Sequence, residues 1–252
     1  MEQADRRILL IKYLLEERNE TTNIPSDEYS QKRLLRALLN VRPPMPVSAE
    51  FLSLQNEYLT ERKNEKGVAD VKSFVYKNDI SLFKGDITTI NADAIVNAAN
   101  SAMLGCFCPN HGCIDNAIHT FAGVQVRLDC NDIMKGREAE NGEVIVTKAY
   151  NLPSRFIFHT AGPIVNGCIT PQNQADLTKC YENCLEKADG MKLESIAFCC
   201  ISTGVFGYPK EEAATLTVQT VKDYKSRTES GLKIIFNVFT EEDYAIYKRI
   251  LG

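Results

Sequence analysis

The stretch GCFCPNHGCIDN, residues 105–116, gathers side chains that bind transition metals. Cys106, His111 and Cys113 form a C-x4-H-x-C pattern, and Cys108 lies inside it. Two thiolates and one imidazole form a ligand set that suits Zn²⁺. Three protein ligands leave a fourth position for water or substrate, which is typical of a catalytic site, whereas Cys108 as a fourth ligand would close a structural site. The pattern therefore predicts zinc and leaves both kinds of site open.

Asp115 follows two positions after the last of these residues, where a helix is expected to begin. A carboxylate there can interact favourably with the helix dipole, or it can orient or deprotonate a water beside a metal. His119 and His159 are interpreted as packed histidines with satisfied hydrogen bonds. The other cysteines are interpreted mostly as small buried apolar side chains; they are Cys130, Cys168, Cys180, Cys184, Cys199 and Cys200.

Three other segments place polar groups or glycines directly after apolar runs. Asp86 in KGDIT can bind a ligand amine or cap the next turn, and capping is favoured. Asn97 and Asn100 in NAAN can bind sugar hydroxyls or form a tight turn. The loop 202–208, STGVFGY, has two glycines before a helix, so it can approach a diphosphate closely or serve as a plain turn.

Residues 70–252 alternate short β-rich runs with helical ones, which predicts an α/β fold with a mostly parallel sheet. Ligands of such sheets bind beyond the carboxyl ends of the strands, where the segments above lie. The expected strands are 73–77, 80–85, 93–99, 144–150, 155–161, 195–202 and 233–239. The expected helices are 113–123, 173–190, 209–226 and 241–251.

The first 68 residues have a different pattern, with apolar residues at helical spacing. Prolines after Val41 are expected to end one helix, and Ser48 is expected to cap the next. The polar run 61–67, ERKNEKG, is interpreted as a linker. The sequence therefore predicts a helical N-terminal extension, residues 1–68, followed by an α/β domain, residues 69–252.

The composition excludes several classes of protein. Of the 252 residues, 44% are hydrophobic and 25% are charged, and the net charge of −4 disfavours a nucleic-acid-binding protein. No apolar run is long enough to cross a membrane, and the N-terminus does not resemble a signal peptide. We therefore expect a cytoplasmic monomer in a reducing compartment, where clustered cysteines favour a metal over disulfides.

Together, GDIT, NAAN, the cysteine-rich loop ending in DNAIHTFAG, and STGVFGYP resemble the motifs of a macrodomain. The stretch GCFCPNHGCIDNAIHTFAG resembles the zinc-containing class of that family, whose members also carry an N-terminal helical extension. The resemblance covers about residues 70–252. It implies a three-layer α/β/α fold with a central mixed, mostly parallel sheet and an ADP-ribose pocket at the carboxyl edge of that sheet.

The resemblance also implies roles for individual residues in binding ADP-ribose. Asp86 would contact the adenine amine, and Ile87 would supply a nearby backbone N–H. Asn100 would bind the distal ribose, with Asn97 supporting its loop, while Phe239 would stack on adenine. The loop that would wrap the diphosphate and ribose consists of Ser202, Thr203, Gly204, Val205, Phe206, Gly207 and Tyr208.

The family's catalytic and metal residues map onto the cysteine-rich loop and its surroundings. Cys106, His111 and Cys113 match the zinc ligands, whereas Cys108 is not a matched ligand. Asp115 matches the acidic residue of related hydrolytic macrodomains and would act on the attacking water, with Asn100 beside it. Zinc would then activate a water or position the ribose, and the sequence does not choose between these roles.

Such enzymes remove mono-ADP-ribose from proteins, chiefly from acidic side chains. The resemblance also implies, as a partner, a lipoyl-carrier protein modified by a sirtuin-like ADP-ribosyltransferase. A reader that binds ADP-ribose without hydrolysis, with a structural zinc, is the alternative, because the pocket motifs would serve both functions. The acidic balance gives little support to a macrodomain that binds poly(ADP-ribose) or RNA.

Overall fold

The computed structural model describes residues 1–252, and its first part is a bundle of three helices. These are α1 (Gln3–Glu17), α2 (Glu28–Val41) and α3 (Ala49–Lys66). As predicted, α2 ends before the prolines, and the Ser48 side chain caps α3 by accepting a hydrogen bond from the Phe51 N–H. The linker predicted at 61–67 is wrong. Its residues are mostly good helix formers, so α3 continues to Lys66 and ends at Gly67, which has a φ of 77°.

A six-stranded sheet forms the centre of the rest of the chain. Its strands are β1 (Ile80–Lys84), β2 (Ala94–Ala99), β3 (Val144–Lys148), β4 (Phe156–Ala161), β5 (Ser195–Phe198) and β6 (Lys233–Val238). Their order is β1-β6-β5-β2-β4-β3, and every neighbouring pair is parallel except β3 with β4. The mixed, mostly parallel sheet is therefore confirmed.

The strand expected at 73–77 is absent. A short 3₁₀ helix, η1 (Val71–Ser73), precedes an extended segment in which only Lys77 forms a bridge, to Ile80. Phe74 and Tyr76 of this segment are half-buried, but no strand pairs with it beyond Lys77, and Val75 is 88% exposed. A second 3₁₀ helix, η2 (Ile87–Thr89), follows β1.

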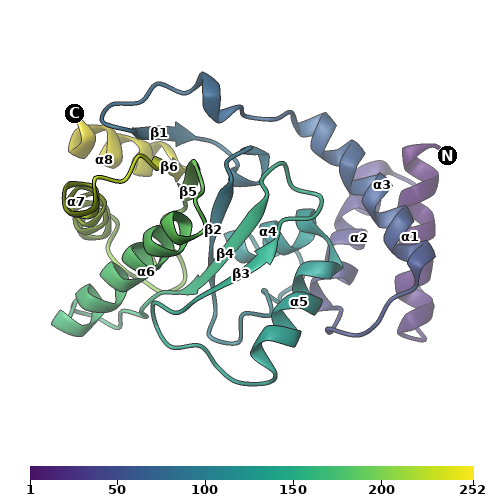
Figure 1. Cartoon of the computed structure of the whole chain (residues 1–252). Helices are drawn as coiled ribbons and strands as arrows, with labels where there is room; N and C mark the ends of the chain where they lie inside the picture. The colour runs from purple at the N-terminus through teal and green to yellow at the C-terminus, as the bar shows by residue number, and fades with distance from the viewer.

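Helices cover both faces of the sheet (Figure 1). The helices α6 (Pro171–Gly190), α7 (Lys210–Thr228) and α8 (Glu241–Leu251) lie on one side. The helices α4 (Ile114–Ala122) and α5 (Val124–Met134) lie on the other, and α1 to α3 pack outside them. The three-layer fold preceded by N-terminal helices is therefore confirmed, although α5 was not predicted.

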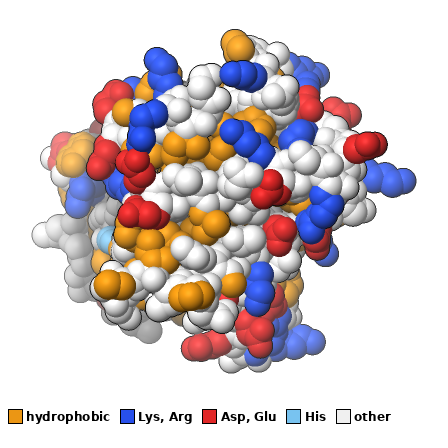
Figure 2. All heavy atoms as spheres, turned by 90° about the vertical axis from the view of Figure 1, so that its left-hand side faces the viewer, with side chains coloured by type: hydrophobic (Ala, Val, Ile, Leu, Met, Phe, Trp, Pro, Cys, Tyr) orange, Lys and Arg blue, Asp and Glu red, His pale blue; other side chains and the backbone are white.

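Two hydrophobic cores stabilise the molecule. The larger one combines the apolar residues of the strands with the inner faces of α4 to α8. The smaller one joins Leu10, Leu14, Leu35 and Phe51 of the N-terminal helices to Val124 of α5. Figure 2 shows acidic and basic side chains interspersed over the face formed by α6, α7 and α8, without a broad patch of either sign. No helix combines the length and the apolar character needed to span a membrane.

Candidate active site

A pocket of about 510 Å³ lies at the carboxyl ends of β2, β4, β5 and β6. The strands β2 and β5 pair only at Ala94–Ile196 and Ile95–Ala197, so the sheet opens beyond these residues. The loops that follow both strands line the resulting gap, as expected for ligand sites of parallel sheets. Such a volume is suited to a nucleotide-sized ligand.

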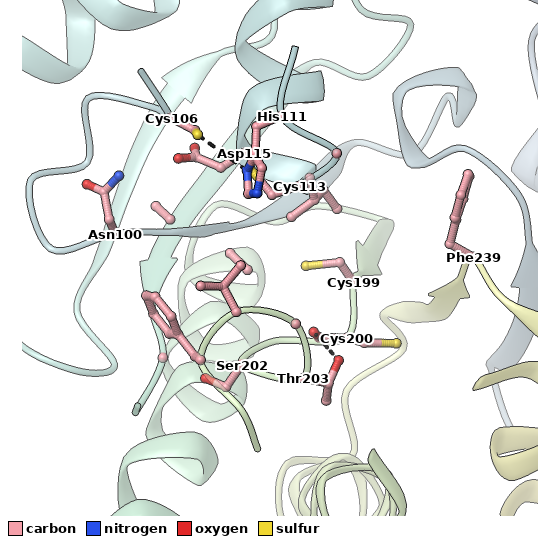
Figure 3. Close-up of a pocket in the computed structure, with 18 of the residues that line it drawn as sticks. Asn100, Cys106, His111, Cys113, Asp115, Cys199, Cys200, Ser202, Thr203 and Phe239 are labelled. Atoms are coloured by element: carbon pink, nitrogen blue, oxygen red, sulfur yellow. Dashed lines mark hydrogen bonds between the residues drawn. The ribbon is translucent and has the colours of Figure 1, made fainter. Parts of the chain in front are cut away.

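At one end of the pocket lie Cys106, His111 and Cys113, which we call the loop cluster (Figure 3). Their ligand atoms all lie within 4.8 Å of one another, and Cys106 Sγ is 3.5 Å from His111 Nδ1. All three side chains are half-buried, and burial raises the pKa of the Cys113 thiol, so its thiolate form needs a nearby cation. A sulfur and nitrogen donor set at these separations fits a tetrahedral zinc ion.

Cys108 lies outside this group. Its side chain is exposed, and it is not among the residues whose ligand atoms converge. Its backbone oxygen instead accepts hydrogen bonds from His111 N–H, at 3.2 Å, and from the Asn116 side-chain amide, at 3.0 Å. Cys108 therefore shapes the loop through its backbone, and the geometry supports a site with three protein ligands.

Asp115 lies beside the loop cluster in the pocket wall, in the first turn of α4. The side chain of Cys113 caps this helix by accepting a hydrogen bond from Asn116 N–H at 3.4 Å. Asp115 is only 4% exposed, and one oxygen accepts a hydrogen bond of 2.7 Å from the Asn97 amide. Burial raises the pKa of the Asp115 carboxyl to about 6, against the opposing effects of Asn97 and the Arg127 charge.

Behind Asp115 lies a second group of donors, His119, Cys130 and His159, which we call the buried cluster. Its ligand atoms also lie within 4.8 Å of one another, and His119 Nε2 is 3.5 Å from an Asp115 oxygen. The Asn97 amide is 3.1 Å from His159 Nδ1 and bonds Asp115 as well. Asn97 thus joins the candidate catalytic carboxylate to the buried cluster.

The two histidines of the buried cluster differ in their hydrogen bonds. His159 has the satisfied environment that was predicted, because Thr147 Oγ1 contacts its other ring nitrogen at 2.9 Å. The same prediction is wrong for His119, since neither of its ring nitrogens has a hydrogen-bond partner. Its ring packs against Gly105, where a Cβ would lie 2.8 Å from the His119 Cγ. Gly105, with a φ of 83°, therefore lets the loop that carries the loop cluster pass close to α4.

Asn100 and the loop after β5 line other parts of the pocket. The Asn100 amide donates to Gly105 O at 3.1 Å, while its Oδ1 is buried without a partner. Ser202 Oγ is also buried without a partner, and Thr203 is fixed by a 3.0 Å hydrogen bond to Cys200 O. Free buried oxygens in a pocket wall are available to the hydroxyl groups of a ligand.

The remaining predicted ligand contacts divide into two groups. Phe239 lies at the far end of the pocket and is 76% exposed, so one face of its ring is free for stacking; Gly204, Val205 and Phe206 also line the pocket. Five predicted residues do not line it: Asp86, Ile87, Asn97, Gly207 and Tyr208. Gly207 and Tyr208 shape the loop, since Tyr208 N–H bonds Ser202 O at 3.0 Å.

Asp86 has protein partners for both of its oxygens. One accepts a hydrogen bond from Thr88 N–H at 2.9 Å, which is the predicted capping role, and the other is 2.6 Å from Lys66 Nζ. The adjacent Ile87 is buried within η2. Lys66 belongs to α3, so the N-terminal helices reach the position where the resemblance places the adenine contact.

Several pocket residues did not stand out in the sequence. Cys199, Cys200 and Gly162 follow buried strands, while Asn237 and Asp243 flank the exit of β6. The signal available for these residues was their position near the end of a predicted strand, and too many other residues share that position for it to single them out. Of the cysteines predicted to be buried, Cys168 is exposed and Cys200 is half-buried, whereas Cys130, Cys180, Cys184 and Cys199 are buried as predicted.

Sequence comparison places this chain in a known family. Residues 96–217 match the model of the Macro domain. The chain is also 48% identical over 261 residues to a protein-ADP-ribose hydrolase from Treponema medium, with 100% of each chain covered. The chain belongs to the macro domain family. Because the whole macrodomain chain is aligned, this similarity includes the N-terminal helices.

Solved macrodomains have the same fold. The Oceanobacillus iheyensis macrodomain with ADP is 41% identical, with a TM-score of 0.62, and the match covers 71% of this chain and 93% of that chain. The Trypanosoma brucei macrodomain in complex with ADP-ribose is 27% identical, with a TM-score of 0.67 and coverage of 86% and 95%. The macrodomain fold predicted from the motifs is therefore confirmed.

Proposed function

We propose that this macrodomain is a zinc-dependent hydrolase that releases mono-ADP-ribose from the Asp or Glu side chains of modified proteins. The observation that carries the proposal is the position of Asp115 beside the loop cluster, in the wall of a nucleotide-sized pocket. The full-length similarity to a protein-ADP-ribose hydrolase and the similarity to macrodomains that bind ADP or ADP-ribose support it.

The pocket offers a distinct partner for each part of ADP-ribose. The exposed Phe239 ring can stack on adenine, and the 202–206 loop can follow the diphosphate and ribose. The free Oδ1 of Asn100 can accept a hydrogen bond from a hydroxyl of the distal ribose. This orientation would bring the C1″ end of the ligand toward Asp115 and the loop cluster.

In the proposed reaction, water attacks C1″ and the bond between C1″ and the carboxylate oxygen of the modified side chain breaks. The side chain leaves as a carboxylate with the bonding electron pair, and the water oxygen becomes the C1″ hydroxyl of ADP-ribose. Asp115 would orient the water and accept its proton. The Asn97 hydrogen bond holds the Asp115 carboxylate in place for this role.

The loop cluster would hold the metal through Cys106, His111 and Cys113. When bound there, Zn²⁺ supplies Lewis acidity toward an oxygen of water or ribose. The role of this chain's own residues is to set the three donors at the end of the pocket and to keep the adjacent carboxylate largely dehydrated. Cys108 is not needed in this arrangement, because its side chain points to solvent.

The proposal is tested by incubating zinc-loaded and chelated protein with substrates mono-ADP-ribosylated on Glu or Asp and, separately, on Ser or Arg. A lipoyl-carrier protein modified by a sirtuin-like transferase is an informative additional substrate. We expect the loaded protein to release ADP-ribose from the acidic linkage and the chelated protein to be strongly impaired. Asp115→Ala should lower the rate by about 10²- to 10⁴-fold, while ADP-ribose affinity should change by less than about 5-fold.

Each failure would have a distinct meaning. Retained ADP-ribose binding without release from any substrate would favour a reader with a structural zinc. Equal rates for loaded and chelated protein would contradict zinc dependence but not hydrolysis. Release only from Ser or Arg would contradict the proposed linkage, and normal hydrolysis by Asp115→Ala would remove Asp115 from the mechanism.

A further inference from the structure

The N-terminal helices make hydrogen bonds to the loop that carries the loop cluster. Arg36, near the middle of α2, donates from one guanidinium nitrogen to the backbone oxygen of His111 at 3.0 Å. Two of its nitrogens donate to Asn116 Oδ1, at 3.0 and 2.7 Å. A single side chain of the extension therefore holds both a candidate zinc ligand and the first turn of α4.

Asn116 extends this contact along the loop. Its side-chain amide donates to Cys108 O at 3.0 Å, and its backbone N–H donates to Cys113 Sγ at 3.4 Å. Asn116 is fully buried, so these bonds are shielded from competing water. The path from Arg36 through Asn116 reaches the backbone inside the cluster and one of its sulfurs.

A second residue of α2 makes an independent link. Asn40 is 1% exposed; its Oδ1 accepts from Asn110 N–H at 3.0 Å, and its amide donates to Thr120 Oγ1 at 3.0 Å. Asn110 precedes the ligand His111, while Thr120 lies in α4. Arg36 and Asn40 thus bond the loop to α2 at two points, and each of these side chains also forms a hydrogen bond with α4.

We infer that the N-terminal helices are part of the metal centre, with Arg36 as the positioning residue that presets the loop cluster for zinc. The inference rests on the zinc site of the proposed function. A loop without these ties would sample other conformations, and the free energy needed to order it would be subtracted from metal binding. The charged Arg36 donors also make stronger hydrogen bonds than neutral donors would.

The test compares zinc affinity across full-length variants by competition with a chromogenic chelator. Arg36→Ala should weaken zinc binding by roughly 10- to 100-fold, the usual effect of losing a partner that orients a ligand. Arg36→Lys should recover part of the loss, because an ammonium can replace one of the hydrogen bonds but cannot bond Asn116 and His111 together as the planar guanidinium does. ADP-ribose affinity of the chelated protein should change by less than about 3-fold, since Arg36 does not line the pocket.

Arg6→Ala is the matched control. Arg6 belongs to the same three-helix bundle and pairs with Glu57 at 3.0 Å, away from the loop. Because its ion pair is partly exposed, Arg6→Ala should shift thermal unfolding of the chelated protein only slightly and should leave zinc affinity within about 2-fold of wild type. In a double-mutant cycle, the losses from Asn116→Ala and Arg36→Ala should be less than additive, because both variants remove the hydrogen bonds between Arg36 and Asn116 Oδ1.

The outcomes separate this inference from the proposed function. Unchanged zinc affinity in Arg36→Ala, an equal loss in Arg6→Ala, or no zinc binding by the wild type would overturn the inference. Tight zinc binding that Arg36→Ala weakens, in a protein that hydrolyses no substrate, would overturn the proposed function and leave the role of Arg36 standing.

Discussion

The loop cluster and the buried cluster have similar donor atoms in opposite surroundings. The loop cluster combines two cysteines with one histidine, all half-buried beside the pocket, while the buried cluster combines two histidines with one cysteine, all removed from solvent. In both, the ligand atoms lie within 4.8 Å of one another. Proximity of donors therefore does not distinguish a metal site from a packed polar core.

The two histidines of the buried cluster differ from each other, since His119 has no hydrogen-bond partner whereas His159 has two, and His159 distinguishes this cluster from the loop cluster. Both ring nitrogens of His159 are engaged, by Asn97 and Thr147, so this histidine has no free lone pair for a metal. In the loop cluster the only hydrogen-bonding contacts of the ligand atoms are the one between Cys106 and His111 and the cap from Asn116 to Cys113. The buried cluster is therefore interpreted as the support of Asp115, and the loop cluster as the candidate metal site.

The comparison is tested most strongly by removing one cysteine from each cluster. Cys106→Ala should reduce zinc content from about one ion per chain to a small fraction and abolish zinc-dependent hydrolysis, because two ligands hold zinc far more weakly than three. Cys130→Ala should keep full zinc content. Zinc is measured by mass spectrometry after gel filtration, and loss of zinc from Cys130→Ala alone would reverse the assignment of the two clusters.

Asn97 connects the clusters, and its removal should affect catalysis more than binding. Asn97→Ala leaves the buried Asp115 carboxylate without its amide donor and removes a partner of His159. We expect the hydrolysis rate to fall by roughly 10- to 100-fold and stability to fall by about 1–3 kcal/mol. ADP-ribose affinity, measured by calorimetry, should change by less than about 3-fold, since Asn97 does not line the pocket.

Asn151→Ala provides the control for lost stability. Asn151 is also buried and donates to Asn56 and to Ala122 O, but it does not line the pocket or contact Asp115. It should lower stability by a similar amount with a rate close to wild type. If both variants lose the same fraction of activity, the Asn97 hydrogen bond has no specific role in positioning Asp115.

Contacts between residues that lie close together along the chain could be predicted from the sequence, whereas contacts between distant residues could not. The loop cluster and Asp115 lie within ten positions, so their types and spacing were sufficient to predict a shared site. The Ser48 cap and the strand-helix alternation are local for the same reason. By contrast, Asn97 meets His159 through the register of β2 with β4, which no local pattern specifies.

The contacts of the N-terminal helices with the rest of the chain were even less predictable from local sequence patterns. Arg36 contacts Asn116 across 80 positions, and Lys66 meets Asp86 only because α3 continues through a run that reads as a linker. Exposed charged residues are compatible with either helix or loop, and packing decides between them. The helices were predicted, but their contribution to the candidate metal site required the folded structure.

Burial of the histidines should make stability depend on pH. Burial lowers the pKa of His159 from 6.5 to about 3, and it also lowers the pKa of His119. Because the unfolded chain binds these protons at higher pH than the folded chain does, the histidines should lower the free energy of unfolding as the pH drops below about 6.5. Asp115 has the opposite effect below about pH 6, because its raised pKa makes the folded chain bind that proton first, so it offsets part of the loss. Each histidine contributes a slope of up to about 1.4 kcal/mol per pH unit.

Urea unfolding of the chelated protein between pH 7 and 5 measures this dependence. His159→Gln should be less stable at pH 7 but lose less stability on acidification, since only His119 remains to bind the extra proton. Equal slopes for His159→Gln and wild type would show that His159 is not held neutral by burial.

The smallest effect is expected at Cys108, the one cysteine of the loop that belongs to neither cluster. Its exposed sulfur makes no contact with the other donors, while its backbone oxygen is fixed by His111 and Asn116. Cys108→Ser keeps that backbone, so zinc affinity and hydrolysis should stay within about 2-fold of wild type. A loss approaching that of Cys106→Ala would mean that four protein residues hold the metal in a closed site. Such a site would have no position for water or ribose, which would favour a module that binds ADP-ribose without hydrolysing it.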